Sequence, residues 1–258
     1  MLLDGFHGGG FALAALAALL IGVAKTGVPG FGILAVPIMV LAVGDARHAA
    51  GWLLPLLCVA DLAAITVYRR HAQGRRLAQL APWVLAGMGV GALTLAAPER
   101  SLRLLVAAIV IVMIGLRWLR GRGATGPDAA VSPAAPQAKD RWWQAAGYGA
   151  SAGFATTVAN AAGPVMNLYL LARRLPKHDF VATGAWFFFA VNLVKLPIYV
   201  GHALIDRRSL TFDAALVPAV LVGAVVGRVV LAHIPQAAFD KLVMALTVGA
   251  AVLLLVPR

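Results

Sequence analysis

Long apolar runs separated by short polar loops dominate this chain. Six of them are near the roughly 20 residues that a helix needs to cross a bilayer: 46–68, 77–97, 102–119, 180–200, 210–232 and 237–256. Four shorter runs precede them in pairs, at 11–24 with 33–43 and at 142–155 with 165–172. The order short, short, long, long, long thus occurs twice. This pattern predicts an all-α polytopic membrane protein built from two five-segment repeats.

Each short pair is interrupted by a glycine-containing break. The first break is residues 25–32 (KTGVPGFG) and the second is residues 156–164 (TTVANAAGP). We expect the flanking pieces to be too short to cross the bilayer. An interrupted helix leaves peptide N–H and C=O groups without partners, which is tolerated only where they face protein or a polar cavity. Paired breaks in matching halves are typical of a transporter's binding site.

Residue matches at constant spacing support an internal duplication. In the first half Gly22, Gly32, Asp61 and Tyr68 correspond, in order, to Gly153, Gly163, Asn192 and Tyr199. A P-x4-G-x3-G pattern at 82–91 recurs at 218–227, and small residues four apart let helix backbones approach closely in lipid. We therefore predict that these glycines pack helices together.

The segment between the halves, 121–140, is rich in Gly, Ala and Pro and is predicted to be a flexible cytoplasmic linker. The chain then divides into a first transmembrane repeat at 1–120, the linker at 121–140, and a second transmembrane repeat at 141–258.

Composition supports the membrane assignment. Of the 258 residues, 61% are hydrophobic and only 12% are charged, too few for a soluble domain of this size. The net charge of +12 could suggest a nucleic-acid partner, but the Lys and Arg residues collect in short loops, which is how membrane topology is encoded. We expect a multi-pass protein of a bacterial-type cytoplasmic membrane, with lipid rather than nucleic acid around it. Residues 11–24 lack the basic start and the cleavage site of a signal peptide, so we expect them to stay in the fold.

Two topologies fit the short pairs. If each pair is a re-entrant hairpin, each repeat crosses three times and the second repeat is inverted. If each pair is one broken span, each repeat crosses four times and both repeats point the same way. The distribution of Lys and Arg between the two sides slightly favours inversion. We predict inverted repeats, with the broken span as the alternative.

Three ionisable residues lie well inside apolar segments: Lys25, Asp61 and Lys195. Each costs roughly 2.5 to 3.5 kcal/mol at the centre of a membrane helix, so we treat them as functional candidates. Lys25 ends a half-helix beside a glycine-rich turn. The N–H groups of that turn and the start of the next half-helix attract negative charge. Lys25 and Lys195 could instead extend to an interface.

The second break offers neutral donors where the first offers a cation. We expect the two turns to face each other near the midplane and to hold a small oxyanion. The predicted substrate-binding residues are Lys25, Thr26, Gly27, Gly30, Gly32, Thr156, Thr157, Asn160, Gly163, Asn167, Asn192 and Lys195. Replacing Lys25 by Met is expected to abolish anion binding with little loss of folded protein.

Asp61 has two interpretations, which the sequence leaves open. It is the only acid that we place deep in a spanning segment, so it could exchange a proton during transport. It could equally form a structural ion pair with Lys195. Asn192, at the corresponding position of the second half, is interpreted as a hydrogen-bonding residue.

Other apparent motifs do not lie in the structural setting that their function requires. Residues 149–153 (GASAG) match the nucleophile elbow of hydrolases, but they lie in an apolar helical run rather than a strand-to-helix turn. No spacing among the six His residues suggests a metal site, and no nucleotide-binding motif is present. The single Cys58 permits no intramolecular disulfide. We expect neither an enzyme nor a bound cofactor or metal.

At the two breaks the chain resembles a known family. Residues 22–37 (GVAKTGVPGFGILAVP) are similar to the first signature of the sulfite exporter (TauE/SafE) family. The second half agrees, with Gly153-Phe154, then 160–164 (NAAGP), then Asn192-x-x-Lys195. Many members carry a denser glycine cluster where this chain has Val28-Pro29. The resemblance implies secondary transport or export of small sulfur-containing anions such as sulfite, thiosulfate or organosulfonates.

Two functions of different class therefore remain. The first is an anion exporter that works by alternating access and is coupled to protons through Asp61. The second is a non-transporting membrane protein, either an assembly partner or a membrane enzyme, that kept the fold. A homodimer is left open in both.

Overall fold

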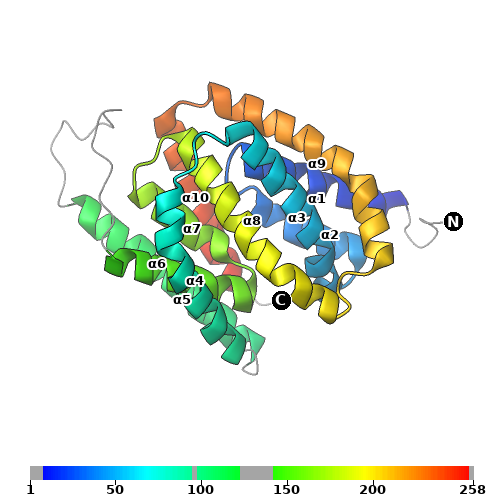
Figure 1. Ribbon diagram of the computed structural model, residues 1–258, viewed down its shortest axis with the longest axis horizontal. Coiled ribbons are helices and arrows are strands. Elements are labelled where there is room, and N and C mark those ends of the chain that lie inside the picture. Colours follow the sequence, from blue (N-terminus) through cyan, green and yellow to red (C-terminus); the bar gives the residue numbers. More distant parts are fainter. Residues whose placement is uncertain (1–7, 95–97, 123–141, 256–258) are drawn as a thin grey trace. The chain divides into compact units, whose positions relative to one another are not determined.

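The computed structural model describes residues 8–94, 98–122 and 142–255, and within these ranges every regular element is an α-helix (Figure 1). The helices are α1 (Gly8–Thr26), α2 (Gly32–Val43), α3 (Ala46–Tyr68), α4 (Gly74–Leu93), α5 (Glu99–Arg122), α6 (Trp142–Ala159), α7 (Ala162–Ala172), α8 (Lys177–Gly201), α9 (Arg207–His233) and α10 (Gln236–Leu255). The predicted all-helical fold is confirmed.

Five helices in the described ranges are long and apolar enough to cross a membrane: α1, α3, α8, α9 and α10. Four of them were predicted as spans. The fifth, α1, corrects the expectation that both pieces around the first break are too short, because the helix runs from Gly8 to Thr26 instead of covering only 11–24. The predicted spans at 77–97 and 102–119, in α4 and α5, are not among these five and stay predictions.

The helices form two compact units, and each unit contains helices from both halves of the sequence. Unit 1 comprises residues 1–72 and 177–235, hence α1, α2, α3, α8 and α9. Unit 2 comprises residues 73–176 and 236–258, hence α4 to α7 and α10. The predicted division into repeats at 1–120 and 141–258 remains a statement about sequence duplication, and most of the predicted linker falls outside the described ranges.

In unit 1 the backbones of α1 and α9 touch at glycines, and the two helices run side by side (Figure 1). A Cβ atom on Gly22 would overlap the carbonyl oxygen of Val220, and one on Gly223 would overlap that of Leu19. The predicted packing role of the glycines in 218–227 is therefore confirmed, and their partner is the first helix of the chain.

Unit 2 repeats this contact with the corresponding helices. Here α6 packs on α4, where a Cβ atom on Gly153 would overlap the carbonyl oxygen of Val84 and one on Gly87 would overlap that of Ala150. The first short helix of each half thus packs on the fourth helix of the other half. The sequence duplication is matched by two equivalent glycine-lined helix pairs.

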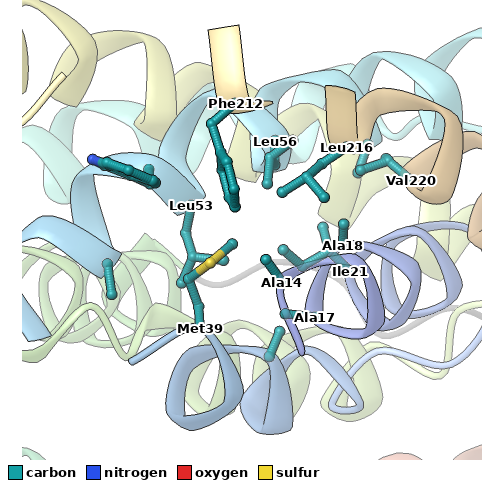
Figure 2. Packing of buried hydrophobic residues seen from close by; sticks show 14 residues of the cluster. Ala14, Ala17, Ala18, Ile21, Met39, Leu53, Leu56, Phe212, Leu216 and Val220 are labelled. Carbon is teal, nitrogen blue, oxygen red and sulfur yellow. The ribbon is translucent and has the colours of Figure 1, made fainter. Parts of the chain in front are cut away.

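The chain reverses direction between α1 and α2. Met39, late in α2, belongs to the same buried cluster as Ala14 and Ala17, early in α1, together with Leu53 and Phe212 (Figure 2). A helix that continued in the direction of α1 would carry Met39 away from these alanines, so α1 and α2 form a hairpin. A hairpin returns the chain to its starting side, and three helices then follow in that half. This favours the inverted arrangement of the repeats, which stays a prediction.

The glycine contacts predict which small substitutions the fold tolerates. Gly22→Ala and Gly153→Ala should each lower the free energy of unfolding by about 1 to 3 kcal/mol, because the added methyl group pushes two backbones apart. Gly89→Ala in α4 and Gly249→Ala in α10 are matched controls, since a Cβ atom there meets open space. Thermal unfolding of the purified proteins in detergent measures the difference. Equal melting temperatures for Gly22→Ala and its controls would contradict the α1–α9 contact.

The inverted topology predicts the sidedness of two exposed loops. Arg174 follows α7 and His202 follows α8. In a Cys58→Ser background, Arg174→Cys should resist an impermeant maleimide in intact cells, because inversion places it in the cytoplasm, and His202→Cys should react. The broken-span topology reverses both results. Labelling after the cells are lysed controls for the reactivity of each cysteine.

Candidate functional site

The first break is a tight turn that places Lys25 in the last turn of α1. The N–H of Gly27 still donates to the carbonyl of Val23 at 2.8 Å, and α2 begins when Ile33 N–H donates to the Gly30 carbonyl at 3.1 Å. Gly30 has φ 121°, a conformation that side chains other than glycine rarely adopt. The break therefore depends on Gly30 and ends α1 just beyond its only cation.

Lys25 forms an ion pair with Asp61 on α3. Its Nζ lies 2.7 Å from Asp61 Oδ1, and the Asp61 side chain is fully buried while 14% of the Lys25 side chain is exposed. The other carboxylate oxygen, Oδ2, accepts a hydrogen bond of 3.0 Å from Asn192 Nδ2 on α8. The ammonium also lies 4.2 Å from the centre of the Phe188 ring. Lys25 is thus held between a carboxylate and an aromatic face.

The partner of Asp61 is therefore Lys25, whereas the sequence had suggested Lys195. Asp61 and Asn192 occupy corresponding positions in the two repeats, and α3 packs directly on α8. Equivalent residues of the two halves thus meet each other in unit 1. The hydrogen-bonding role expected for Asn192 is present.

Lys195 adds a second cation to the same region. Its side chain is only 4% exposed, so it does not extend to the surface of the protein. Its Nζ lies 5.4 Å from the centre of the Tyr199 ring, and it interacts electrostatically with Lys25 and Cys58. We call Lys25, Asp61, Asn192 and Lys195 the Lys25 cluster. With all three ionisable groups charged, the cluster carries one surplus positive charge.

The threonines of both breaks use their hydroxyl groups within the helices. The single hydroxyl hydrogen of Thr26 is shared between the carbonyls of Gly22, 3.0 Å from Oγ1, and Ala224, 2.7 Å from Oγ1, and Thr157 Oγ1 donates to the carbonyl of Gly153 at 3.0 Å. Thr26 is fully buried, and its carbonyl accepts a bond of 2.8 Å from the Tyr68 hydroxyl. Because their hydrogens are committed to the backbone, these threonines hold helices together and cannot donate to an anion without losing those bonds.

The glycines named from the sequence differ in their surroundings. A Cβ atom on Gly27 would come within 2.7 Å of Gly227 Cα, so Gly27 belongs to the α1–α9 contact. A Cβ atom on Gly32 would make an ordinary contact of 3.5 Å with the Ala24 methyl group, and one on Gly163 would meet open space. Among Gly27, Gly30, Gly32 and Gly163, Gly27 is needed for close packing and Gly30 for its backbone conformation, whereas the other two are not constrained in either way.

The second break, in unit 2, is shorter and neutral. After α6 ends, exposed Asn160 takes the left-handed conformation with φ 51°, which asparagine tolerates better than most residues. Its N–H donates to the Thr156 carbonyl at 3.2 Å, and α7 begins two residues later. Buried Asn167 donates to Thr247 Oγ1 on α10 at 3.3 Å. Thr156 is buried in α6.

The predicted site residues are therefore divided between the units. Unit 1 brings Lys25, Asp61, Asn192 and Lys195 together, and unit 2 holds the five residues predicted around the second break. The prediction that one anion is held by both breaks together remains a prediction.

One buried acid contradicts the expectation that Asp61 is alone. Asp213 on α9 is only 3% exposed, and neither of its carboxylate oxygens meets a hydrogen-bond donor in the structure as described. It lies within the predicted span 210–232, so its position in the sequence was a usable signal. Phe188 was also missed, since an aromatic residue in an apolar helix carries no signal of its own.

Comparison with known proteins agrees with this picture. A family model described as "Sulfite exporter TauE/SafE" matches residues 3–254. The chain belongs to this family. The TauE/SafE family is one of membrane transporters and not of enzymes, and with five candidate spans the chain is a multi-pass membrane protein. Searches of curated proteins and of solved structures gave no match.

The ion pair changes the result expected for Lys25→Met. That change alone leaves Asp61 buried and charged without its partner, which typically costs about 3 to 5 kcal/mol. We expect a large loss of thermal stability in Lys25→Met and recovery of most of it in Lys25→Met/Asp61→Asn, because the double variant no longer holds a buried carboxylate that has lost its partner.

The matched control is the double variant Lys25→Met/Lys195→Met, in which Lys195→Met replaces Asp61→Asn as the second change. It should not rescue Lys25→Met, because it leaves the Asp61 carboxylate unpaired. Unfolding of the purified variants in detergent measures the coupling. Rescue by Lys195→Met as good as by Asp61→Asn would contradict the specific pairing of Lys25 with Asp61.

Proposed function

We propose that this protein is a secondary transporter that moves small sulfur-containing anions across the cytoplasmic membrane by alternating access. Sulfite, thiosulfate and organosulfonates are the candidate substrates. Membership of the TauE/SafE family supports the class of substrate. The observation that carries the proposal is the partly exposed Lys25 ammonium at a helix break, in a cluster with a surplus positive charge.

The local backbone supports an anion at this place. The C-terminal end of α1 carries partial negative charge, which stabilises the Lys25 ammonium in its last turn. The N-terminal end of α2, just across the turn, carries partial positive charge and favours an anion. The Lys25 ammonium and the N-terminal end of α2 therefore both attract an anion. A ligand that approaches the cluster meets Lys25 first, because Asp61 behind it is fully buried.

Coupling to protons through Asp61 is part of the proposal. In a membrane helix, the charge of the Asp61 carboxylate is compensated by one ammonium. When that ammonium moves toward another anion, the carboxylate is left uncompensated and binds a proton. The homodimer considered from the sequence gains no support from the family match and is left out. The non-transporting alternative remains an outcome of the test below.

Flux of radiolabelled sulfite and thiosulfate into vesicles containing the purified protein tests this function. Lys25→Met/Asp61→Asn should lower the flux at least tenfold while the protein stays folded, because the recognising cation is gone. Lys241→Met removes an exposed lysine on α10 and should leave the flux unchanged.

Asn160→Ala should weaken binding by about 1 to 3 kcal/mol if the amide donates to the anion.

The contrary results are distinct. Folded wild-type protein that carries no sulfur-containing anion in either direction would support the non-transporting alternative. Normal flux in the Lys25→Met/Asp61→Asn protein would keep the transport function but remove Lys25 from its site.

A further inference from the structure

We propose that the Lys25 cluster accepts one net negative charge at a time: a monoanion alone, or a dianion together with one proton that binds to Asp61. This inference rests on the proposed anion transport and adds to it a rule for the ratio of protons to anions. The ratio is set by the charge of the anion and is not a constant of the protein.

The rule follows from the charges that the fold brings together. Lys25 and Lys195 contribute two positive charges and Asp61 one negative charge. Asp61 is fully buried, Lys195 is 4% exposed, and all three belong to helices long and apolar enough to span the membrane. With little water to screen it, an unbalanced charge here is costly. A monoanion cancels the surplus, whereas a dianion leaves one negative charge unless a proton enters with it.

Asp61 is the group in the cluster that can take this proton. When a dianion draws the Lys25 ammonium toward itself, Asp61 Oδ1 loses the partner that now lies 2.7 Å away. A proton from solution then forms an O–H bond at Oδ1, and Oδ2 can keep its hydrogen bond from Asn192. The ion pair opens, no covalent bond breaks, and the cluster with its dianion is neutral.

The other groups around Asp61 do not offer a better acceptor. Lys25 is the only charged side chain of α1, and α2 has none. On α8, Lys177, His178 and Asp179 lie in the first turn, about four turns from Asn192. On its own helix the nearest titratable group is the Cys58 thiol, which interacts electrostatically with Asp61.

The remaining neighbour, α9, places a basic group but no acid within one turn of its contact with Thr26. Thr26, next to Lys25, bonds to Ala224, and Asp213 lies about three turns before that point on α9. Arg207 and Arg208 start the helix, Arg228 interacts with Tyr68, and His233 ends it. Asp61 is therefore the acid that contacts Lys25, which in turn interacts electrostatically with Lys195.

Two anions of similar chemistry but different charge test the rule. Thiosulfate is a dianion near neutral pH and methanesulfonate is a monoanion. Calorimetric titration of the full-length protein in detergent, in two buffers with different ionisation enthalpies, gives the number of protons taken up per bound anion. We expect about one proton with thiosulfate and about none with methanesulfonate.

Substitutions in the Lys25 cluster identify the residue that binds the proton. Asp61→Asn should bind thiosulfate with no proton uptake, because the amide cannot be protonated in this range. Lys195→Met removes the surplus charge, so methanesulfonate should now bring about one proton. Lys241→Met, on α10, should behave like the wild-type protein. If Lys195→Met does not fold, the comparison of the two anions on the wild-type protein still decides.

The outcomes separate this inference from the function on which it rests. Equal proton uptake with thiosulfate and methanesulfonate would overturn the charge rule and leave anion transport intact. Proton uptake with thiosulfate that persists in Asp61→Asn would overturn the role of Asp61. If neither these anions nor sulfite binds the folded wild-type protein, the proposed function itself fails.

Discussion

The close approach of helix backbones at glycines is the constraint on which the rest of this structure depends. Lipid gives apolar helices no hydrophobic reason to associate, so contact between them requires short side chains and dense packing. In unit 1 the contact of Gly22 with Val220 brings the end of α1 against α9, and there the Thr26 hydroxyl bonds to the Ala224 carbonyl. Tyr68 then ties α3 to the same place through the Thr26 carbonyl. Lys25 can reach Asp61 because these contacts have already fixed α1 beside α3.

The Lys25–Asp61 pair explains how a lysine is tolerated at a helix break within the membrane. Burying either charge alone is costly, and a buried pair gains back only part of that cost. Such a pair is weak evidence for added stability. Its value lies in the ammonium, which remains partly exposed on one side while a fully buried carboxylate holds it on the other. The same geometry lets an incoming anion compete with the protein's own carboxylate.

Much of the fold could be predicted from the sequence, because apolar runs and repeated glycines report directly on helices and their packing. The order of segments, the duplicated halves and the packing role of the glycines were all visible. The candidate residues Lys25, Asp61, Asn192 and Lys195 were found for the same reason, since polar groups are conspicuous in apolar runs. Their pairing was not predictable. Spacing along one helix does not tell which helices are neighbours, so Asp61 was assigned to Lys195 or to no partner.

The contact between Asp61 and Asn192 has a consequence for how such a site can arise. Positions that correspond in the two halves touch each other, so in an assembly of two identical half-length chains the same residue would meet its own copy there. Two carboxylates would repel each other, and two amides would leave Lys25 without a counter-charge. The acid on one side and the amide on the other therefore require two halves whose sequences differ at this position. Divergence of the halves, which a single chain carrying both allows, was a requirement for this charge arrangement and not only a by-product of the duplication.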